Sequence, residues 1–325
     1  MAEAMDRTGS VLQGLDTAKS IFGKATTLGL IAVNAIGVYA LVGMLLTERI
    51  DDDPTFTPAL RTEGGLASVD MMAALIEREV SDKAWVANDP AFVPSAYLRN
   101  MQAYQEGIIY ALSRFGIELA DRLGRSRGAT AVDPDLDRAA GLLRFPGDVW
   151  HFDLSQSFAP TATSESQYIA AANALRAYNA RLAAGEAIFD PRRDNLFAAI
   201  SRIEADISSK ANILVDHVER IAANERVRTD TNQVFFSTKG RLYGYLMVLT
   251  ALGEDFSEVI EREGLTLVWS RLIRSLENAA VMHPFLVTDS APGSMFIPSH
   301  TAELGFFALR VKTQLRDVMG VLNQN

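Results

Sequence analysis

The longest apolar stretch of the chain lies near its N-terminus. Residues 27–47 read TLGLIAVNAIGVYALVGMLLT and contain no charged side chain. A helix rises about 1.5 Å per residue, so about 20 such residues cross the ~30 Å hydrocarbon layer of a bilayer. A cleaved signal peptide has a shorter apolar region, of roughly 7 to 15 residues, that begins closer to the N-terminus. The pattern therefore predicts a transmembrane helix over 27–47 that is retained as an anchor.

Charged residues on either side of this segment favour one orientation. Lys19 and Lys24 precede it, whereas three aspartates follow it at 51–53, although Arg49 weakens the contrast. Lys and Arg accumulate on the cytoplasmic side of membrane helices. We therefore expect residues 1–26 to form a cytoplasmic tail and the residues after the helix to lie in the periplasm, with the anchor in a bacterial inner membrane.

Small side chains line one face of the predicted membrane helix. Gly29, Ala32, Ala40 and Gly43 lie on that face at helical spacing. Small residues let two helices approach closely in lipid, where packing rather than the hydrophobic effect drives association. Such residues are also common in membrane helices, and that explanation is equally good. The lipid bilayer is thus one expected partner, and a second copy of the chain is a candidate for another.

The remaining pattern divides the chain into a tail, a linker and a helical domain. Within 1–26, residues 11–22 alternate apolar and polar positions as in a short amphipathic helix. Residues 48–65 are rich in Asp, Pro and Gly, which predicts a linker. Residues 66–325 carry apolar positions at helical spacing, which predicts an all-α, multi-helix, bundle-like domain.

The individual helices of this domain follow from its apolar stripes and capping residues. The stripes predict helices over 66–80, 97–123, 164–184, 190–221, 242–252, 256–280 and 304–322, and a short helix that begins at Asp133-Pro134. Capping is predicted at Asp133, at Ser164 with Gln167, and at Ser299. The segment 242–252 is apolar all round but too short to cross a bilayer, so it is expected to be a buried core helix. Strand patterns are weak and limited to 144–158 and 285–287.

Composition removes several classes of function. Lys and Arg total 31 against 40 Asp and Glu, for a formal charge of −9, and no basic cluster is present. Phosphate contacts require local positive charge, so nucleic acid is not an expected partner. The chain has no cysteine, which excludes disulfides, thiolate metal ligands and a cysteine nucleophile.

No motif in the sequence specifies a reaction. The four histidines lack metal-ligand spacing, and the chain has no H-E-x-x-H, P-loop or G-x-G-x-x-G turn. The sequence therefore predicts no catalytic, cofactor-binding or metal-binding residue.

An envelope enzyme is the alternative that the sequence leaves open. Glycan cleavage needs paired carboxylates, one of them held protonated by an apolar environment. Glu165 before a helix faintly resembles the start of the catalytic region of lytic transglycosylases, but their glycine-rich continuation is missing, and a first-turn acid is favoured by the helix dipole. A peptidoglycan hydrolase would need a cleft that gathers two or more of Glu106, Asp153, Glu165, His217 and Glu219.

Three long loops, 81–96, 145–160 and 283–300, combine proline with aromatic side chains that look exposed. Those side chains are Trp85, Phe92, Trp150, Phe152, Phe285 and Phe296. Apolar loops of this kind bind partners or fold back over the ends of helical bundles, and both roles fit.

At these loops the sequence resembles a family of bacterial envelope proteins catalogued as domain of unknown function 2333. The resemblance rests on Trp85, Asn88-Asp89-Pro90, Phe92, Pro94, Leu98, Asn100-Met101, Gln105-x-Gly107, Phe235, Gly240, Tyr245, Asp255-Phe256, Leu276-Glu277 and His300. It implies an inner-membrane anchor and a helical domain, and it brings no assigned reaction. The favoured interpretation is a membrane-anchored interaction or scaffold protein with a protein partner in the cell envelope, and the alternative is an envelope hydrolase.

Overall fold

The part of the chain that the structure describes is helical throughout its regular elements. The structure is a computed structural model, and it describes residues 26–27, 29–39, 41–44, 50–123, 132–151, 161–223, 231–282 and 299–324. Within those ranges there is no strand. Residues 144–151 form turns rather than the start of a strand, and the rest of the two weak strand patterns lies outside the described residues. The prediction of an all-α, multi-helix fold is confirmed.

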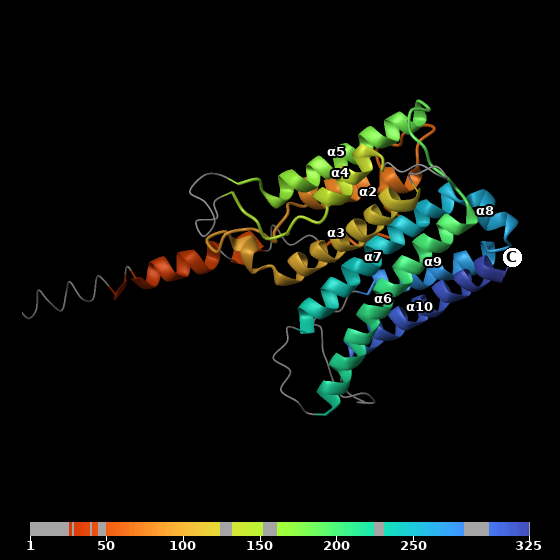
Figure 1. Ribbon diagram of the computed structural model, residues 1–325. Coiled ribbons are helices and arrows are strands. Elements are labelled where there is room, and N and C mark those ends of the chain that lie inside the picture. The colour runs from red at the N-terminus through yellow and green to blue at the C-terminus, as the bar shows by residue number, and fades with distance from the viewer. Residues whose placement is uncertain are drawn as a thin grey trace, which may run out of the picture.

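The helices form an elongated bundle with α7 (Thr231–Asp255) at its centre (Figure 1). On one side of α7 lie α2 (Ala67–Glu77), α3 (Arg99–Glu118), α4 (Pro134–Leu142) and α5 (Ser164–Ala183). On the other lie α6 (Arg193–Ala222), α9 (Thr266–Ala280) and α10 (His300–Gln324). Four short elements complete the set: α8 (Ser257–Arg262), the π turns η1 (Arg78–Asp82) and η3 (Leu119–Leu123), and the 3-10 turn η2 (Pro94–Tyr97).

The predicted apolar stripes form the core. On α10 the stripe Leu304, Ala308, Val311, Leu315, Val318 and Leu322 is buried, and it faces α6 and α9. Segment 242–252 of α7 is buried at every position except Thr250, which confirms its prediction as a core helix. Each buried aliphatic side chain of this kind contributes about 1.5–3 kcal/mol relative to exposure, so the stripes hold the bundle together.

The capping predictions are confirmed at two helices and wrong at one. Asp133 accepts hydrogen bonds from the backbone N–H groups of Asp135 and Leu136, as the sequence indicates. At α5 the cap is Thr163, not Ser164. The hydroxyl of Ser164 instead donates to the carbonyl of Pro146 at 2.8 Å, so it fastens the loop before the helix. Ser299 caps α10 as predicted, by accepting from the N–H of Ala302.

Two helix boundaries also differ from the prediction. The single helix expected over 256–280 is divided into α8 and α9, with Gly264 between them at a φ of +68°. Only glycine adopts that left-handed conformation at little cost, so the helix ends there. The long helix α6 begins at Arg193 rather than at 190, and Asp190 instead pairs with Arg192 at 2.6 Å.

Glycines allow α3 and α7 to cross with their backbones in contact. A Cβ atom on Gly240 would lie 2.8 Å from the carbonyl carbon of Tyr104, and one on Gly107 would lie 2.9 Å from the backbone nitrogen of Arg241. Real Cβ atoms are not found at such distances. This contact fixes α3 against the central helix, and α3 carries one wall of the surface described below.

The start of α2 is capped from a distant part of the chain by Asp255. Its two carboxylate oxygens accept from the N–H groups of Ala67 and Ser68 at 2.7 and 3.0 Å. Burial nevertheless outweighs these hydrogen bonds and raises the pKa of Asp255 to about 6. The carboxyl group is therefore more easily protonated in the folded chain than in the unfolded chain.

This shift predicts a pH dependence of stability. Because the pKa is higher in the folded state, the contribution of Asp255 to stability is greatest below pH about 4 and is lost as the pH rises through about 6. A shift of this size corresponds to at most about 3 kcal/mol. We expect Asp255→Asn to gain stability relative to the parent chain between pH 4 and pH 7, as measured by denaturant unfolding at each pH. Parallel pH profiles of the two proteins would contradict this.

The N-terminal helix projects from one end of the bundle, opposite the end where the chain terminates (Figure 1). Residues 26–27, 29–39 and 41–44 are helical. Their large hydrophobic side chains are exposed, among them Leu30, Ile31, Val33, Ile36, Val38, Tyr39, Leu41 and Val42. Among the described residues, no helix has both the length and the apolarity needed to cross a membrane. The predicted amphipathic helix within 11–22 lies outside the described residues.

Candidate interaction surface

The N-terminal helix meets the domain at the turn η2. Gly43 lies directly against the ring of Pro94, so close that a Cβ atom on Gly43 would collide with it. Met44 packs against a small buried cluster made by Val86, Leu98 and Met101. The last described turn of the helix is thus part of the packed structure of the domain.

The residues that follow the helix are also bound to the domain. We call residues 50–56 the aspartate strap, because they contain Asp51, Asp52 and Asp53. Asp52 forms an ion pair with Lys239 of α7, and the two side chains are 9% and 1% exposed. The carboxylate of Asp51 lies 2.8 Å from the Nζ of Lys83.

Hydrogen bonds to the backbone of the strap come from three core helices or turns. The hydroxyls of Tyr104 and Tyr243 donate to the carbonyls of Asp51 and Asp53, each at 2.9 Å. The guanidinium of Arg78 donates to the carbonyl of Asp51 at 3.2 Å and to the hydroxyl of Tyr243 at 2.7 Å. The strap is therefore held along its length, and the interpretation of 48–65 as a simple linker is corrected for its described part.

Arg78 is the centre of this buried polar network. Its guanidinium lies 2.7 Å from Glu79 and stacks over the ring of Phe56 at 4.6 Å. Burial acts to lower the pKa of Arg78, but the charge of Glu79 together with the interactions with Tyr243 and Tyr104 more than offsets it, and the pKa is raised. The pKa of Glu79 is raised by burial, although Arg78 opposes this. An arginine is charged at any physiological pH, so it stays available to bind the strap.

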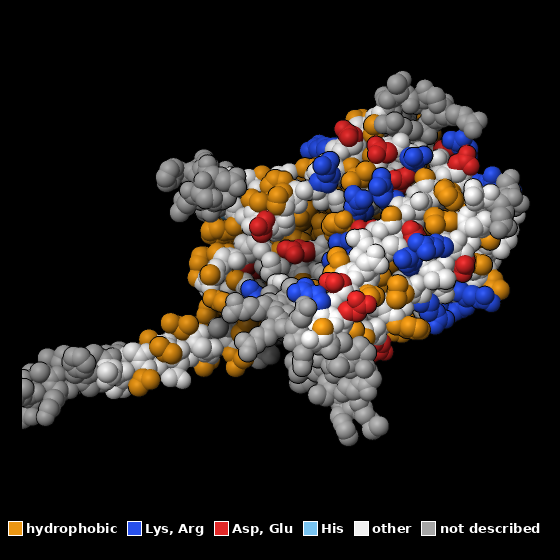
Figure 2. All heavy atoms as spheres, turned by 60° about the horizontal axis from the view of Figure 1, so that its bottom comes forward, with side chains coloured by type: hydrophobic (Ala, Val, Ile, Leu, Met, Phe, Trp, Pro, Cys, Tyr) orange, Lys and Arg blue, Asp and Glu red, His pale blue; other side chains and the backbone are white. Residues whose placement is uncertain are grey.

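Exposed aromatic side chains surround the point where the helix enters the domain. Phe92 is 71% exposed and Tyr97 is 60% exposed, and both lie within three residues of Pro94. The half-buried ring of Trp150 meets Phe92 edge to face at 6.1 Å. We call Phe92, Tyr97 and Trp150 the aromatic rim. Figure 2 shows hydrophobic atoms along the projecting helix and on the end of the domain beside it.

The other predicted loop aromatics do not join this rim in the described structure. Trp85 is 3% exposed, so the expectation that it is a surface residue is wrong. It donates to the carbonyl of Gly147 at 2.8 Å and packs edge to face on Tyr168. Its size favours the core, where it joins two loops. Three further candidates lie outside the described residues: Phe152, Phe285 and Phe296.

The small-residue face of the N-terminal helix is only partly open. Gly29 has open space around it and Ala32 is exposed. Gly43 is covered by Pro94, so its lack of a side chain already serves a contact within the chain. Ala40 lies outside the described residues. A second helix would therefore approach most easily near Gly29 and Ala32.

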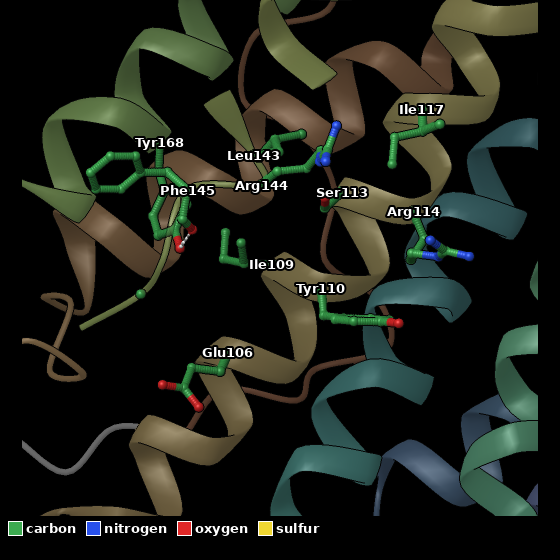
Figure 3. Close-up of a pocket in the computed structure, with 11 residues that line it drawn as sticks. Glu106, Ile109, Tyr110, Ser113, Arg114, Ile117, Leu143, Arg144, Phe145 and Tyr168 are labelled. Carbon is green, nitrogen blue, oxygen red and sulfur yellow. Dashed lines mark hydrogen bonds between the residues drawn. The ribbon is translucent and has the colours of Figure 1, made fainter. Parts of the chain in front are cut away.

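A groove of about 350 Å³ lies between α3 and the segment that joins α4 to α5 (Figure 3). One wall is formed by α3 side chains, including Glu106, Tyr110 and Arg114. The other is formed by the residues around Arg144 and by Tyr168, whose hydroxyl donates to the carbonyl of Phe145 at 2.9 Å. The groove is open and mixed in polarity, as a surface that binds an extended chain would be.

Among the hydrolase candidates that the structure describes, Glu106 is the one that lines this groove. Burial and the nearby charge of Asp148 raise its pKa, while a hydrogen bond from Gln102 opposes the rise. Glu165 accepts a hydrogen bond from Asn88 at 2.6 Å and does not line the groove.

The other hydrolase candidates do not line the groove or lie outside the described residues. His217 contacts the hydroxyl of Thr231 at 3.0 Å, and Glu219 lines a separate hollow between α6 and α10. Asp153 lies outside the described residues. Within the described residues, no group of three or more His, Asp or Glu is arranged to hold a metal ion. Of the predicted acids that the structure describes, the groove thus offers the carboxyl of Glu106 alone.

Comparison with protein families identifies the chain. Residues 63–234 match a family described as uncharacterised protein conserved in bacteria, DUF2333. The chain belongs to this family. Comparisons with curated proteins and with solved structures gave no match. The DUF2333 match begins just after the aspartate strap and runs into the start of α7, so it covers the groove and the aromatic rim.

Several residues that carry the DUF2333 resemblance hold the loops and helices in place. The side-chain amide of Gln105 donates to the carbonyls of Glu79 and Ala84, and its oxygen accepts from the N–H of Val86. Asn88 donates to the carbonyl of Val149 and so links two of the predicted loops. Gly107 permits the crossing of α3 and α7. These residues of the resemblance therefore position the loops and the helices rather than form a reactive site.

Sequence reasoning missed the residues that bind the aspartate strap. Lys239 is the clearest of them, because its side chain is 1% exposed. A buried lysine requires a charge partner or a set of acceptors. The sequence around it gave no signal of burial, since Ser237, Thr238 and Arg241 are polar.

Proposed function

We propose that this protein is an inner-membrane-anchored, periplasm-facing interaction or scaffold protein of the bacterial cell envelope. The observation that carries the proposal is the firm attachment of the apolar N-terminal helix to the helical domain through Pro94 and the aspartate strap. A tether for an independent enzyme needs no such attachment. A platform that presents a surface at a fixed position above a membrane does.

The sequence supplies the remaining support for anchoring. The uncharged segment 27–47 has the length of a membrane span, and Lys19 and Lys24 precede it. In this proposal residues 1–26 are the cytoplasmic tail, 27–47 are the span, 48–65 join it to the domain, and 66–325 are periplasmic. The aromatic rim and the groove beside α3 are the surfaces offered to the bilayer and to an envelope protein. A second copy of the chain would approach at Gly29 and Ala32 of the N-terminal helix.

An envelope hydrolase is the less favoured alternative. The observation that supports this alternative is the raised pKa of Glu106 in the groove. Glycoside hydrolysis requires a second carboxylate at a defined separation, about 5–5.5 Å or about 6.5–9.5 Å according to mechanism. The predicted acids do not supply it within the described groove. We therefore assign the groove to binding rather than to cleavage.

Membrane integration and orientation are tested on the full chain. We expect the protein to stay in the membrane pellet after alkaline extraction, since a span is held by burial of about 20 apolar residues. An alkaline phosphatase fused after Asn325 should be active, and a fluorescent protein that matures only in the cytosol should be dark at the same position. Release into the alkaline supernatant would refute the anchor, and the reverse fusion pattern would refute the orientation.

A further inference from the structure

The depth of the aromatic rim follows from the position of Gly43. The uncharged segment extends from the residue after Lys24 to Thr47. A span of about 20 residues that starts directly after Lys24 ends at about residue 44, and any later start ends further along. Gly43 therefore lies within the last five residues of the span whichever residue begins it.

Pro94 touches Gly43, so the turn η2 lies within about 6 Å in depth of the end of the span. The headgroup layer on each side of the hydrocarbon is only about 5–7 Å thick. The bundle is thus too close to the bilayer for water to separate the two at this point. Side chains that project beside η2 must lie at the boundary between headgroups and acyl chains.

The side chains at that position have the chemistry of the boundary. Phe92 and Tyr97 are among the most exposed large hydrophobic side chains of the bundle, and both flank Pro94. Trp150 packs against Phe92 from the second loop. Aromatic rings with one apolar and one polar part concentrate at membrane interfaces. Arg99, at the start of α3, is exposed, and its positive charge is attracted by phosphate headgroups.

Two of the nearby carboxylates are turned toward protein partners, whereas Asp148 is exposed. Asp89 accepts a hydrogen bond from the hydroxyl of Ser95, and burial raises its pKa. Glu165 accepts from the amide of Asn88. These two acids are therefore engaged within the loops rather than directed at a lipid surface.

We propose that Phe92, Tyr97 and Trp150 form a second membrane-contact surface, which lies in the headgroup boundary of the bilayer beside the anchor and fixes the orientation of the domain. This inference rests on the proposed membrane anchoring. It goes further, because an anchored domain need not touch lipid with its own loops. The occupant of the rim is the lipid bilayer rather than a protein.

The absence of cysteine allows a direct test on the full chain in lipid nanodiscs. Single variants Ile36→Cys, Phe92→Cys and Leu267→Cys are each labelled with a fluorophore, and quenching by lipids that carry a nitroxide is measured. Ile36 reports the anchor and Leu267, 58% exposed at the start of α9, is the matched exposed control. The nitroxide is placed near the headgroup in one lipid and near the end of the acyl chain in another.

We expect the label at Phe92 to be quenched several times more strongly than the label at Leu267, and more by the shallow nitroxide than by the deep one. The label at Ile36 should respond more to the deep nitroxide. Quenching at Ile36 together with equal, weak quenching at Phe92 and Leu267 would overturn the membrane-contact surface and leave the anchor intact. Loss of quenching at Ile36 would overturn the anchor, and the inference with it.

Discussion

Lys239→Met is expected to lower the free energy of unfolding by about 3–5 kcal/mol, because it leaves the carboxylate of Asp52 buried without its charge partner. Lys239 and Asp52 are 1% and 9% exposed, so water cannot replace the lost interaction. The same substitution removes a hydrogen bond from Nζ to the carbonyl of Met282 at 2.5 Å. Denaturant unfolding of the full chain in detergent, followed by circular dichroism, measures the loss.

A matched surface pair provides the control for this prediction. Arg61 and Glu254 form an ion pair at 3.1 Å, but each side chain is 52% exposed. Exposed pairs contribute about 0–1 kcal/mol, so Arg61→Met should have little effect. The double variant Lys239→Met with Asp52→Asn should recover part of the loss, since it removes the unpaired charge. Equal stability of the Lys239 and Arg61 variants would contradict a stabilising role for the buried ion pair between Lys239 and Asp52.

Proteolysis separates an effect on the aspartate strap from an effect on the whole bundle. With Lys239 replaced, residues 50–56 lose the ion pair that holds Asp52 and should open more often than the helices unfold. We expect cleavage within the strap to accelerate before cleavage elsewhere. This outcome would show that the ion pair between Lys239 and Asp52 helps to attach the N-terminal helix to the domain. The proposed platform role depends on that attachment.

The helices could be predicted from the sequence because burial repeats with the period of the helix. The stripe on α10 is an example: its spacing of three and four residues needs no knowledge of the partner helices. The division of 256–280 into α8 and α9 was missed, although Gly264 was a visible signal for a helix end. The apolar pattern continues past that glycine and conceals the break.

The aspartate strap could not be predicted in the same way. Asp53 binds Tyr243, which is 190 positions away, and Asp51 binds Arg78, which is 27 positions away. Segment 48–65 has the composition of a linker, and local hydrogen bonds such as that from the N–H of Thr55 to the carboxylate of Asp53 shape its turns. Distant partners attach its described part to the domain. Trp85 shows the reverse case: it lies in a loop with proline, but contacts with Gly147 and Tyr168 bury it. The local pattern of apolar residues predicts the helices, whereas contacts between distant residues determine which loops are ordered.

Gly240→Ala is expected to be severely destabilising although it adds a single methyl group. The Cβ atom would overlap the backbone of Tyr104, with its carbonyl carbon at 2.8 Å and its Cα at 3.0 Å. A side chain that meets a backbone atom cannot be relieved by rotation, so α3 must move away from α7. Overpacking of this kind costs about 1–3 kcal/mol and more where the backbone must shift.

The groove and the aromatic rim would be disturbed by the same shift, because α3 forms one wall of the groove and follows directly from η2. Gly107→Ala should behave similarly, since its Cβ atom would meet the backbone of Gly240 and Arg241. Gly320→Ala on α10 is the matched control. Nothing lies within 4 Å of a Cβ atom there, so alanine should stabilise the helix by about 0.5–1 kcal/mol.

Thermal unfolding of the three variants in the same detergent distinguishes the two effects of a glycine substitution. The midpoint should fall well below that of the parent chain for Gly240→Ala and Gly107→Ala, and it should rise for Gly320→Ala. A variant Gly244→Ala adds a graded case, because its Cβ atom would meet the side chain of Ala111 at 2.9 Å and can be accommodated in part. If Gly240→Ala were as stable as the parent chain, α3 and α7 could not be in backbone contact, and the position of the candidate interaction surface on the bundle would be wrong.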